Sequence, residues 1–267
     1  MLLVFDIGGT HIRSATSKDG KTFDKPSVIL DTPKDWEEAK KVLHDVCQKQ
    51  GKAEQVCVAI AGEFDENRSQ LVFSPNLLDW VEKPLKRFFE DETGASVRLV
   101  NDAVAAAIGE ARQGAGKGHV IVAYLTVGTG LGGARVVDGN LDENSQGFEP
   151  GQQIIDSATG ETLEKRVAGA GFAARFGVDF VKTAPKEAWE AAAKELAVGI
   201  HNTIDYWSPD IIVFGGSMIL KPNGIPLDRV RAHLTALNKK EKIPPIVPAA
   251  LGDESGLRGA LAILTQG

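Results

Sequence analysis

Short runs of apolar residues recur along the chain and predict buried strands. Most of these runs end at a glycine or at a polar pair, which is typical of a strand that leads into a turn. The predicted strands cover residues 2–5, 13–16, 56–61, 97–100, 120–127, 133–137 and 211–214, and a further short strand is expected within 243–250, which holds three prolines.

Between these runs, apolar residues recur at helical spacing and predict helices. The predicted helices cover residues 35–50, 83–91, 103–113, 161–168, 186–206, 227–237 and 257–264. The first carries its apolar face on Trp36, Ala39, Leu43, Val46 and Cys47, and the longest on Trp189, Ala193, Leu196, Ile200 and Ile204. The polar stretch 138–160 is expected to be a loop.

Because strands and helices alternate, the pattern predicts an α/β protein with mostly buried sheets. The pattern is also duplicated. A strand, a glycine turn and a second strand occur around residues 6–10 and again around 126–130. We interpret the duplication as two related halves that face a cleft, with a boundary near the glycine-rich turn 114–118.

The composition is that of an ordinary globular protein. Of the 267 residues, 43% are hydrophobic, 25% charged and 6% aromatic, which excludes a disordered chain, a collagen-like fibre and a coiled coil. The 30 Lys and Arg against 36 Asp and Glu give a net charge of -6. This charge argues against a general nucleic-acid binder and against binding to an anionic membrane.

The cysteines and the chain start bear on the compartment. The two cysteines, Cys47 and Cys57, exclude a disulfide scaffold and suggest a reducing environment. We expect no signal peptide, because Asp6 interrupts the first apolar stretch and no basic residue precedes it. The longest largely apolar run, 120–127, is far shorter than the ~20 residues that span a bilayer. We therefore expect a soluble cytoplasmic protein.

The two glycine turns, 8–10 and 128–130, suggest a phosphate site. Glycine lets backbone N–H groups approach an anion, and a threonine hydroxyl adds a donor. Asp6, at the end of a strand, is a candidate Mg²⁺ ligand. Each turn alone could be a simple tight hairpin, but the two together suggest a clamp on a polyphosphate chain. Both lead into strands, so neither is a P-loop or a dinucleotide-binding turn.

Two further segments end buried strands. Asn101 and Asp102 lie between a strand and a helix, which is where α/β proteins place ligands, although capping of the helix explains the pair equally well. Gly215 and Gly216 follow the strand 211–214 and would let a flat base lie against the backbone. For this second pair, a simple strand end is the alternative.

In their order along the chain, these segments resemble the ROK family of sugar kinases and repressors, within the sugar-kinase, actin and heat-shock-chaperone superfamily. The resemblance covers nearly the whole chain. DIGGT (6–10) resembles the first phosphate motif, SPNLLDW (74–80) the sugar loop, and NDAVAAAIGEA (101–111) the catalytic and connecting motif. LTVGTGLGGARVVDGN (125–140) resembles the second phosphate motif, IIVFGGSM (211–218) the adenosine motif, and GLRGALAIL (256–264) the second connecting helix.

The resemblance implies a fold of two actin-like (ribonuclease H-like) α/β domains that flank a cleft. The smaller N-terminal domain would comprise residues 1–116 plus 253–267, and the larger C-terminal domain residues 117–252. It also implies an enzyme that uses ATP and Mg²⁺ to phosphorylate a hexose or an amino sugar. The sugar, the hydroxyl and the oligomeric state stay open, with a homodimer as one assembly considered.

The resemblance further implies a role for each matched residue. Asp102 would be the general base, and Asp6 would hold Mg²⁺ through water. The sugar hydroxyls would bind to the backbone of Gly62 and to the side chains of Asn76, Asn101, Asp102, Glu149, Gln152 and Glu164. The phosphates would lie on Gly8, Gly9, Thr10, Gly128, Thr129 and Gly130, and the adenosine on Gly215 and Gly216.

At one position the chain departs from the family pattern. Gln152 stands where many members have a histidine that serves both zinc and the sugar, and no cysteine follows Cys57. We therefore expect no zinc site. Gln152 can still form a hydrogen bond with a sugar hydroxyl, but it cannot titrate near neutral pH.

Three alternatives remain at this point. The first is a sugar-responsive transcriptional repressor. Family repressors carry a winged-helix domain before the first phosphate motif, which here begins at Asp6, and the negative charge disfavours DNA binding. A non-catalytic sugar-binding regulatory protein would not need the Asp102 carboxylate. Polyphosphate could replace ATP as the donor, although the pair Gly215 and Gly216 favours ATP.

A kinase must exclude water, so two halves that close on the sugar are expected, with hinges at 114–118 and in the proline-rich stretch 243–250.

Overall fold

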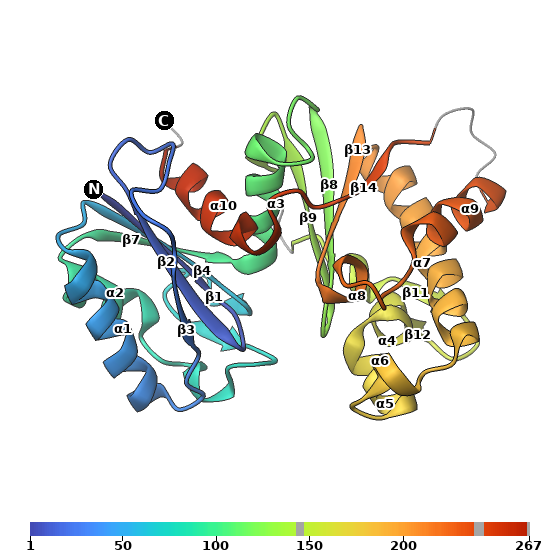
Figure 1. The fold of residues 1–267 in the computed structure, drawn as a ribbon, viewed down its shortest axis with the longest axis horizontal. Coiled ribbons are helices and arrows are strands. Elements are labelled where there is room, and N and C mark those ends of the chain that lie inside the picture. The colour runs from blue at the N-terminus through green and yellow to red at the C-terminus, as the bar shows by residue number, and fades with distance from the viewer. Residues whose placement is uncertain (143–146, 238–242, 266–267) are drawn as a thin grey trace. The chain divides into compact units, whose positions relative to one another are not determined.

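The computed structural model describes residues 1–142, 147–237 and 243–265. Its contacts divide the chain into two compact units (Figure 1). The first unit comprises Met1–Gly109 with Asp253–Gly267, and the second comprises Glu110–Gly252. The predicted domain limits, 1–116 plus 253–267 and 117–252, stay a prediction.

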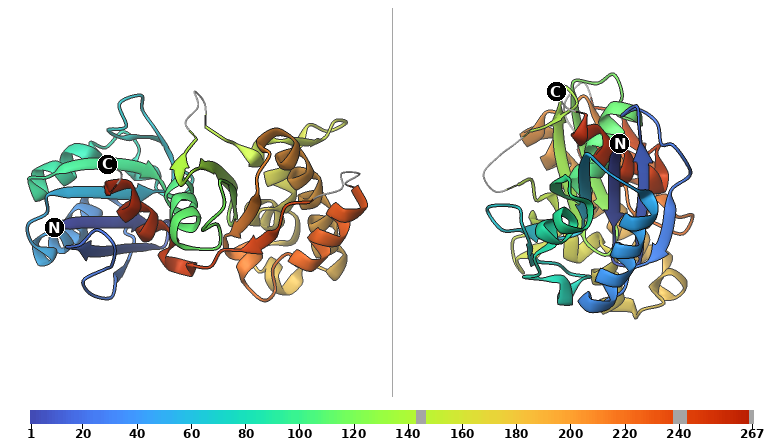
Figure 2. Two further views of the ribbon diagram at one scale, coloured as in Figure 1. Left: turned by 90° about the horizontal axis from the view of Figure 1, so that it is seen from above. Right: turned by 90° about the vertical axis from the view of Figure 1, so that its left-hand side faces the viewer.

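The first unit contains a five-stranded sheet of order β3-β2-β1-β4-β7 (Figures 1 and 2). Strand β1 pairs antiparallel with β2 and parallel with β4, and β4 pairs parallel with β7. The strands are β1 (Leu2–Ile7), β2 (His11–Ser17), β3 (Val28–Asp31), β4 (Gln55–Ile60) and β7 (Ser96–Asn101). The short strands β5 (Glu63–Phe64) and β6 (Leu71–Phe73) form a separate hairpin.

Helices cover both faces of this sheet. Side chains alternate along β1, so Leu3, Phe5 and Ile7 join a core with α1 and α2, whereas α10 packs against β1 and β4. The Asp35 carboxylate caps α1 by accepting the Glu38 N–H at 2.9 Å. The elements are α1 (Trp36–Gln50), the 3₁₀ turn η1 (Leu78–Trp80), α2 (Leu85–Thr93), α3 (Asp102–Gln113), in which the division between the units falls, the 3₁₀ turn η3 (Gly252–Glu254) and α10 (Ser255–Leu264).

The second unit repeats the topology of the first. Its sheet has the order β10-β9-β8-β13-β14, with β8 antiparallel to β9 and parallel to β13, and β13 parallel to β14. The strands are β8 (Ile121–Val127), β9 (Leu131–Val137), β10 (Asn140–Leu141), β13 (Ile211–Gly215) and β14 (Ile246–Pro248), with a separate hairpin of β11 (Ile154–Asp156) and β12 (Glu161–Thr162). The predicted α/β class is confirmed, and the repeated strand order explains the repeated glycine turn.

The helices of the second unit form its core around α7 (Lys186–Trp207), which buries Ala193, Leu196, Ile200 and Ile204 as predicted. The others are η2 (Pro150–Gln152), α4 (Leu163–Val167), α5 (Gly169–Phe176), α6 (Phe180–Thr183), α8 (Ser217–Leu220) and α9 (Leu227–Leu237). Among the described residues, no helix combines the length and the apolar character needed to span a membrane.

Some predictions differ from the structure. Strand β3 was not predicted, because all four of its residues are exposed and show no alternation of burial. The stretch 138–160, predicted as a loop, contains β10, η2 and β11, and its residues 143–146 lie outside the described residues. The helix predicted over 161–168 begins only after β12, and Thr162 caps it by accepting the Lys165 N–H.

Candidate active site

The first glycine turn, Gly8–Thr10, joins β1 to β2, and donors from the segment after β3 hold its carbonyl groups. The carbonyl of Gly8 accepts the Thr32 hydroxyl at 2.8 Å, that of Thr10 accepts the Thr32 N–H at 2.9 Å, and that of Gly9 accepts the Lys34 ammonium. A trans peptide directs its C=O and N–H to opposite sides. The amides of Gly9 and Thr10 therefore point away from these donors, and among the described residues neither has an acceptor.

The second glycine turn, Gly128–Gly130, joins β8 to β9 and is built in the same way. The carbonyls of Gly128 and Thr129 accept the N–H groups of Gly169 and Ala170 at 2.8 and 2.9 Å, from the start of α5. The amides of Thr129 and Gly130 have no acceptor within the part of the chain that the structure describes. Pairs of unsatisfied N–H groups of this kind form concave sites for anions.

Asn101 and Asp102 lie at the end of β7 and the start of α3. The Asn101 Oδ1 accepts the N–H groups of Ala103 and Val104 at 2.9 and 3.2 Å, and its Nδ2 donates to the Gly62 carbonyl at 3.1 Å. Asn101 is therefore a helix cap, the alternative that the sequence left open. The Asp102 Oδ1 accepts the Ala103 N–H at 2.9 Å, while Oδ2 has no hydrogen-bond partner among the described residues.

Two carboxyl groups of the first unit, those of Asp6 and Asp102, have raised pKa values. Loss of hydration raises the pKa of Asp102, although the Ala103 N–H opposes this rise. Burial and the charge of Asp102 raise the pKa of Asp6 to about 7, despite the nearby Arg13 guanidinium. Arg13 also pairs with Asp253 at 3.3 Å. The negative charge exceeds the positive charge here, and carboxylate oxygens are the ligands that Mg²⁺ prefers, so the chemistry of these side chains is compatible with a cation held through water.

The loop 74–80 places Asn76 against the first glycine turn. A Cβ added to Gly9 would lie 2.7 Å from the Cβ of Asn76, so the two backbones approach closely. The Ser74 hydroxyl anchors the loop by donating to the Ala61 carbonyl at 2.8 Å. Gly62, the residue after Ala61, has a φ of 149°, and a Cβ there would lie 2.4 Å from the Phe73 carbonyl oxygen, so the position requires glycine. The structure thus groups these predicted residues in the first unit.

Three predicted sugar ligands lie in the second unit. Glu149 precedes the turn η2 and Gln152 is its last residue; the Gln152 N–H donates to the Glu149 carbonyl at 3.1 Å, and both residues are exposed. Glu164 is half-buried in α4. Its Oε2 accepts the Leu131 N–H at 2.7 Å, so one carboxylate oxygen already supports the second glycine turn.

Gly215 and Gly216 end β13 beside β8. Gly216 has a φ of +86°, and a Cβ there would lie 2.3 Å from the carbonyl oxygen of Val127, the residue before the second glycine turn. The structure therefore brings the predicted adenosine segment to the second glycine turn, within one unit.

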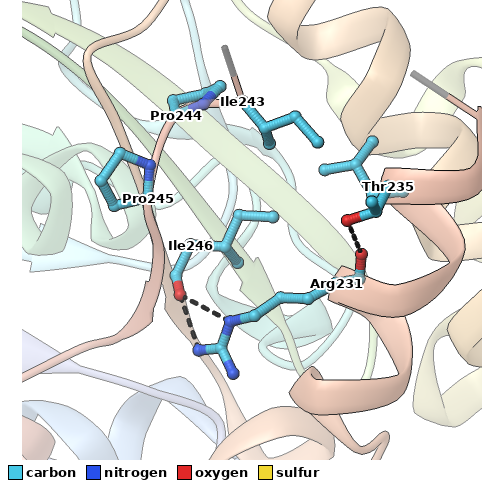
Figure 3. Close-up of a pocket in the computed structure, with 7 residues that line it drawn as sticks. Arg231, Thr235, Ile243, Pro244, Pro245 and Ile246 are labelled. Atoms are coloured by element: carbon cyan, nitrogen blue, oxygen red, sulfur yellow. Dashed lines mark hydrogen bonds between the residues drawn. The ribbon is translucent and has the colours of Figure 1, made fainter. Parts of the chain in front are cut away.

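A separate cavity of about 330 Å³ contains none of the predicted site residues (Figure 3). Its lining residues are Arg231, Leu234, Thr235 and Ile243–Ile246. Arg231 donates to the Ile246 carbonyl from both Nε and Nη2, at 3.2 and 2.7 Å, and so holds α9 to the first residue of β14. Among the described residues, no group of three or more His, Cys, Asp or Glu is placed to hold a metal ion. The expected lack of zinc stays a prediction.

Sequence reasoning missed the residues that hold the two glycine turns. Thr32 and Lys34 belong to the connection between β3 and α1, and Gly169 and Ala170 start α5. None lies in a recognisable motif, and each acts through contacts with residues more than 20 positions away. Thr32 is a buried polar residue in a loop, which would have marked it as structurally important, but its burial is known only from the structure.

The sequence and the fold are similar to those of known proteins. The model of the ROK family matches residues 2–153 and 156–267. The structure resembles that of a ROK hexokinase from Thermus thermophilus, with a TM-score of 0.82, 27% identity and coverage of 97% of this chain and 96% of that one. It also resembles a ROK family glucokinase from Streptomyces griseus in complex with glucose and AMPPNP, with a TM-score of 0.78, 25% identity and coverage of 100% and 99%.

A curated relative, the bifunctional enzyme NanE/NanK of Brucella melitensis, is 30% identical over 280 residues. The match includes 97% of this chain but 52% of that protein, so the chain spans about half of the relative's length. The family match extends over nearly every residue and includes both glycine turns, the segment around Asp102 and the Gly215–Gly216 pair. This chain is a member of the ROK family.

Proposed function

We propose that the protein is a sugar kinase that transfers the γ-phosphoryl group of ATP to a hydroxyl group of a hexose or an amino sugar. The observation that carries this proposal is the Asp102 carboxylate at the β7–α3 junction. One of its oxygens is fixed by the Ala103 N–H, and the other has no hydrogen-bond partner among the described residues. Family membership and the similarity to a hexokinase and a glucokinase support a kinase.

Asp102 acts as the general base in this proposal. Its Oδ2 takes the proton of the sugar hydroxyl while the hydroxyl oxygen attacks the γ-phosphorus. The bond from that phosphorus to the ADP oxygen breaks, and the products are the sugar phosphate and ADP. Asn101 fixes the start of α3 and so orients Asp102. A base of this kind contributes about 10²–10⁴-fold to the rate.

The two glycine turns hold the donor. The amides of Gly9 and Thr10 and those of Thr129 and Gly130 donate to phosphate oxygens, and the Thr10 and Thr129 hydroxyls add donors. Phosphoryl transfer depends mainly on alignment and charge neutralisation, which such donors provide. Mg²⁺, when bound with ATP, would neutralise charge on the phosphates, with Asp6 holding it through water. Gly215 and Gly216 border the adenosine, which favours ATP over polyphosphate.

The acceptor sugar binds through hydroxyl contacts. We assign these to Asn76, the Gly62 backbone, Glu149, Gln152 and Glu164, with Asp102 at the reacting hydroxyl. Glu164 can offer only Oε1 without losing its bond to the Leu131 N–H. Gln152 contributes an amide, which donates and accepts without a change of charge near neutral pH.

A coupled assay of ADP release tests this function. The acceptors are glucose, mannose, fructose, N-acetylmannosamine and N-acetylglucosamine, each with ATP and Mg²⁺. In a separate series with polyphosphate as the donor, the sugar phosphate itself is measured, because no ADP forms. We expect ADP release with at least one sugar and little without sugar. Phosphorylation of a sugar with polyphosphate but not with ATP would identify polyphosphate as the donor. No phosphate transfer to any of the sugars would favour a non-catalytic sugar-binding protein instead.

A further inference from the structure

The segment Thr32–Trp36 contacts two parts of the first unit that the proposed reaction uses separately. On one side are the three carbonyl groups of the first glycine turn. On the other side is the loop 74–80, which contains Asn76. No motif of the sequence includes this segment, and neither the general base nor the phosphate donors lie in it.

Lys34 contacts both parts with one group. Its ammonium donates to the Gly9 carbonyl and also to the Asn76 carbonyl, at 3.0 Å. An ammonium group has three protons and accepts no hydrogen bond, so it can bridge two carbonyls without competition between them. Hydrogen bonds from a charged donor are about twice as strong as those between neutral groups.

Further contacts align the segment with the loop 74–80. The Trp80 indole N–H donates to the Pro33 carbonyl at 3.2 Å, and the Asp79 carboxylate accepts the Trp36 N–H at 2.8 Å. The rings of Trp36 and Trp80 meet edge to face, with centroids 5.4 Å apart. The backbone beside Lys34 is therefore fixed to the loop by groups other than Lys34 itself.

The contact with Gly9 also affects an amide of the turn. The Gly9 carbonyl and the Thr10 N–H belong to the same peptide group. A cation on the carbonyl oxygen holds the plane of this peptide and polarises it, which strengthens the N–H as a donor. The contact with the Asn76 carbonyl affects the binding of the sugar, because it fixes the backbone that carries the Asn76 side-chain amide.

We infer that Lys34 is a positioning residue that couples the phosphate-binding turn to the sugar-binding loop. This inference rests on the proposed function. Lys34 does not touch the reacting atoms. It holds the Thr10 N–H toward the donor phosphate and Asn76 toward the sugar at the same time, so loss of one side chain weakens the binding of both substrates.

The variant Lys34→Met tests the inference, because it keeps an unbranched side chain as far as Cε and removes the ammonium group with its three donors. We expect the KM values for sugar and for ATP to rise together, each by about 10-fold, with a smaller change in kcat. Lys34→Arg keeps a cation within reach of both carbonyls and should restore part of both KM values. Lys40→Met is the matched control, since Lys40, in α1, forms an ion pair with Glu37 and with no other residue that the structure describes.

Two results would overturn the inference in an active wild-type enzyme. One is a Lys34→Met variant that melts at a lower temperature but keeps both KM values within twofold, which indicates a purely structural role. The other is a change in the KM of one substrate only. A wild-type protein that phosphorylates no sugar would instead contradict the proposed function, so the two failures are distinguishable.

A measurement on the wild type keeps the inference testable if Lys34→Met does not fold. Hydrogen exchange of residues 74–80 is followed with and without AMPPNP, in the absence of sugar. Because Lys34 joins the turn to this loop, binding of the nucleotide analogue at the turn should slow exchange in the loop several-fold. Exchange that stays the same while the turn itself becomes protected would overturn the coupling.

Discussion

At the scale of single residues, the environment of Asp102 sets the pH dependence of the proposed reaction. The base must be ionised to accept a proton, and loss of hydration raises the pKa of Asp102 above the value of about 3.9 for a free aspartate. The rate should therefore fall as the pH is lowered through this raised pKa.

A pH profile of kcat/KM for the sugar checks this prediction. We expect the acid limb at a higher pH than a free aspartate would give, and we expect Asp102→Asn to remove most of the activity at every pH. A wild-type profile that stays flat down to pH 4 would contradict a partly dehydrated base at this position.

The sequence predicted which residues are chemically able to act, but not how they are held. Asn101 was expected both to cap α3 and to bind sugar, and the structure has its Oδ1 on two backbone N–H groups. Glu164 was expected to bind sugar, and one of its oxygens binds the Leu131 N–H. Hydrogen bonds of this kind depend on neighbours that are distant in the chain, so no local pattern reveals them.

At the scale of elements, a buried carboxylate holds together two connections of the second unit. Glu110, in α3, accepts the Ala115 N–H at 2.8 Å and, from the segment after β14, the N–H groups of Ala250 and Leu251 at 3.1 and 2.8 Å. Glu110→Gln would turn an amide NH₂ toward one of these donors. We expect a loss of about 1–3 kcal/mol in the free energy of unfolding.

Denaturation by urea measures this loss, with Glu187→Gln, at an exposed site of α7, as the control. The control should change the free energy of unfolding by no more than about 0.5 kcal/mol. If the two variants are equally stable, the carboxylate is not needed to hold these connections.

Helices and strands could be predicted from the sequence where their buried residues recur at regular spacing. The apolar face of α1 was predicted residue by residue from its helical spacing. The buried residues of the helix are the predicted ones, Trp36, Ala39, Leu43, Val46 and Cys47. Strand β3 was not, because it lies at the edge of the sheet with all four residues exposed. The missed strand matters for the site, since the segment after β3 carries Thr32 and Lys34, which hold the first glycine turn.

At the scale of the whole molecule, the repeated topology accounts for the two glycine turns. Each sheet places its turn between the first two antiparallel strands, and the same repeat is visible in the amino-acid sequence. A kinase with its donor bound must keep water from the phosphate. We predict that sugar binding changes the shape of the molecule, with bending at 114–118 and 243–250.

Small-angle scattering with and without a saturating sugar substrate checks this prediction. The radius of gyration should decrease when the sugar binds. Identical scattering profiles, measured on a sample in which binding has been verified by calorimetry, would count against closure.

The central claim is that the Asp102 carboxylate deprotonates the sugar hydroxyl, and it is tested most directly by comparing turnover with sugar affinity in Asp102→Asn. The amide keeps the shape of the side chain and can still accept the Ala103 N–H, but it is not basic. We predict a fall in kcat of about 10²–10⁴-fold, with the sugar dissociation constant within a fewfold of the wild-type value. A variant that turns over sugar at the wild-type rate would contradict the claim.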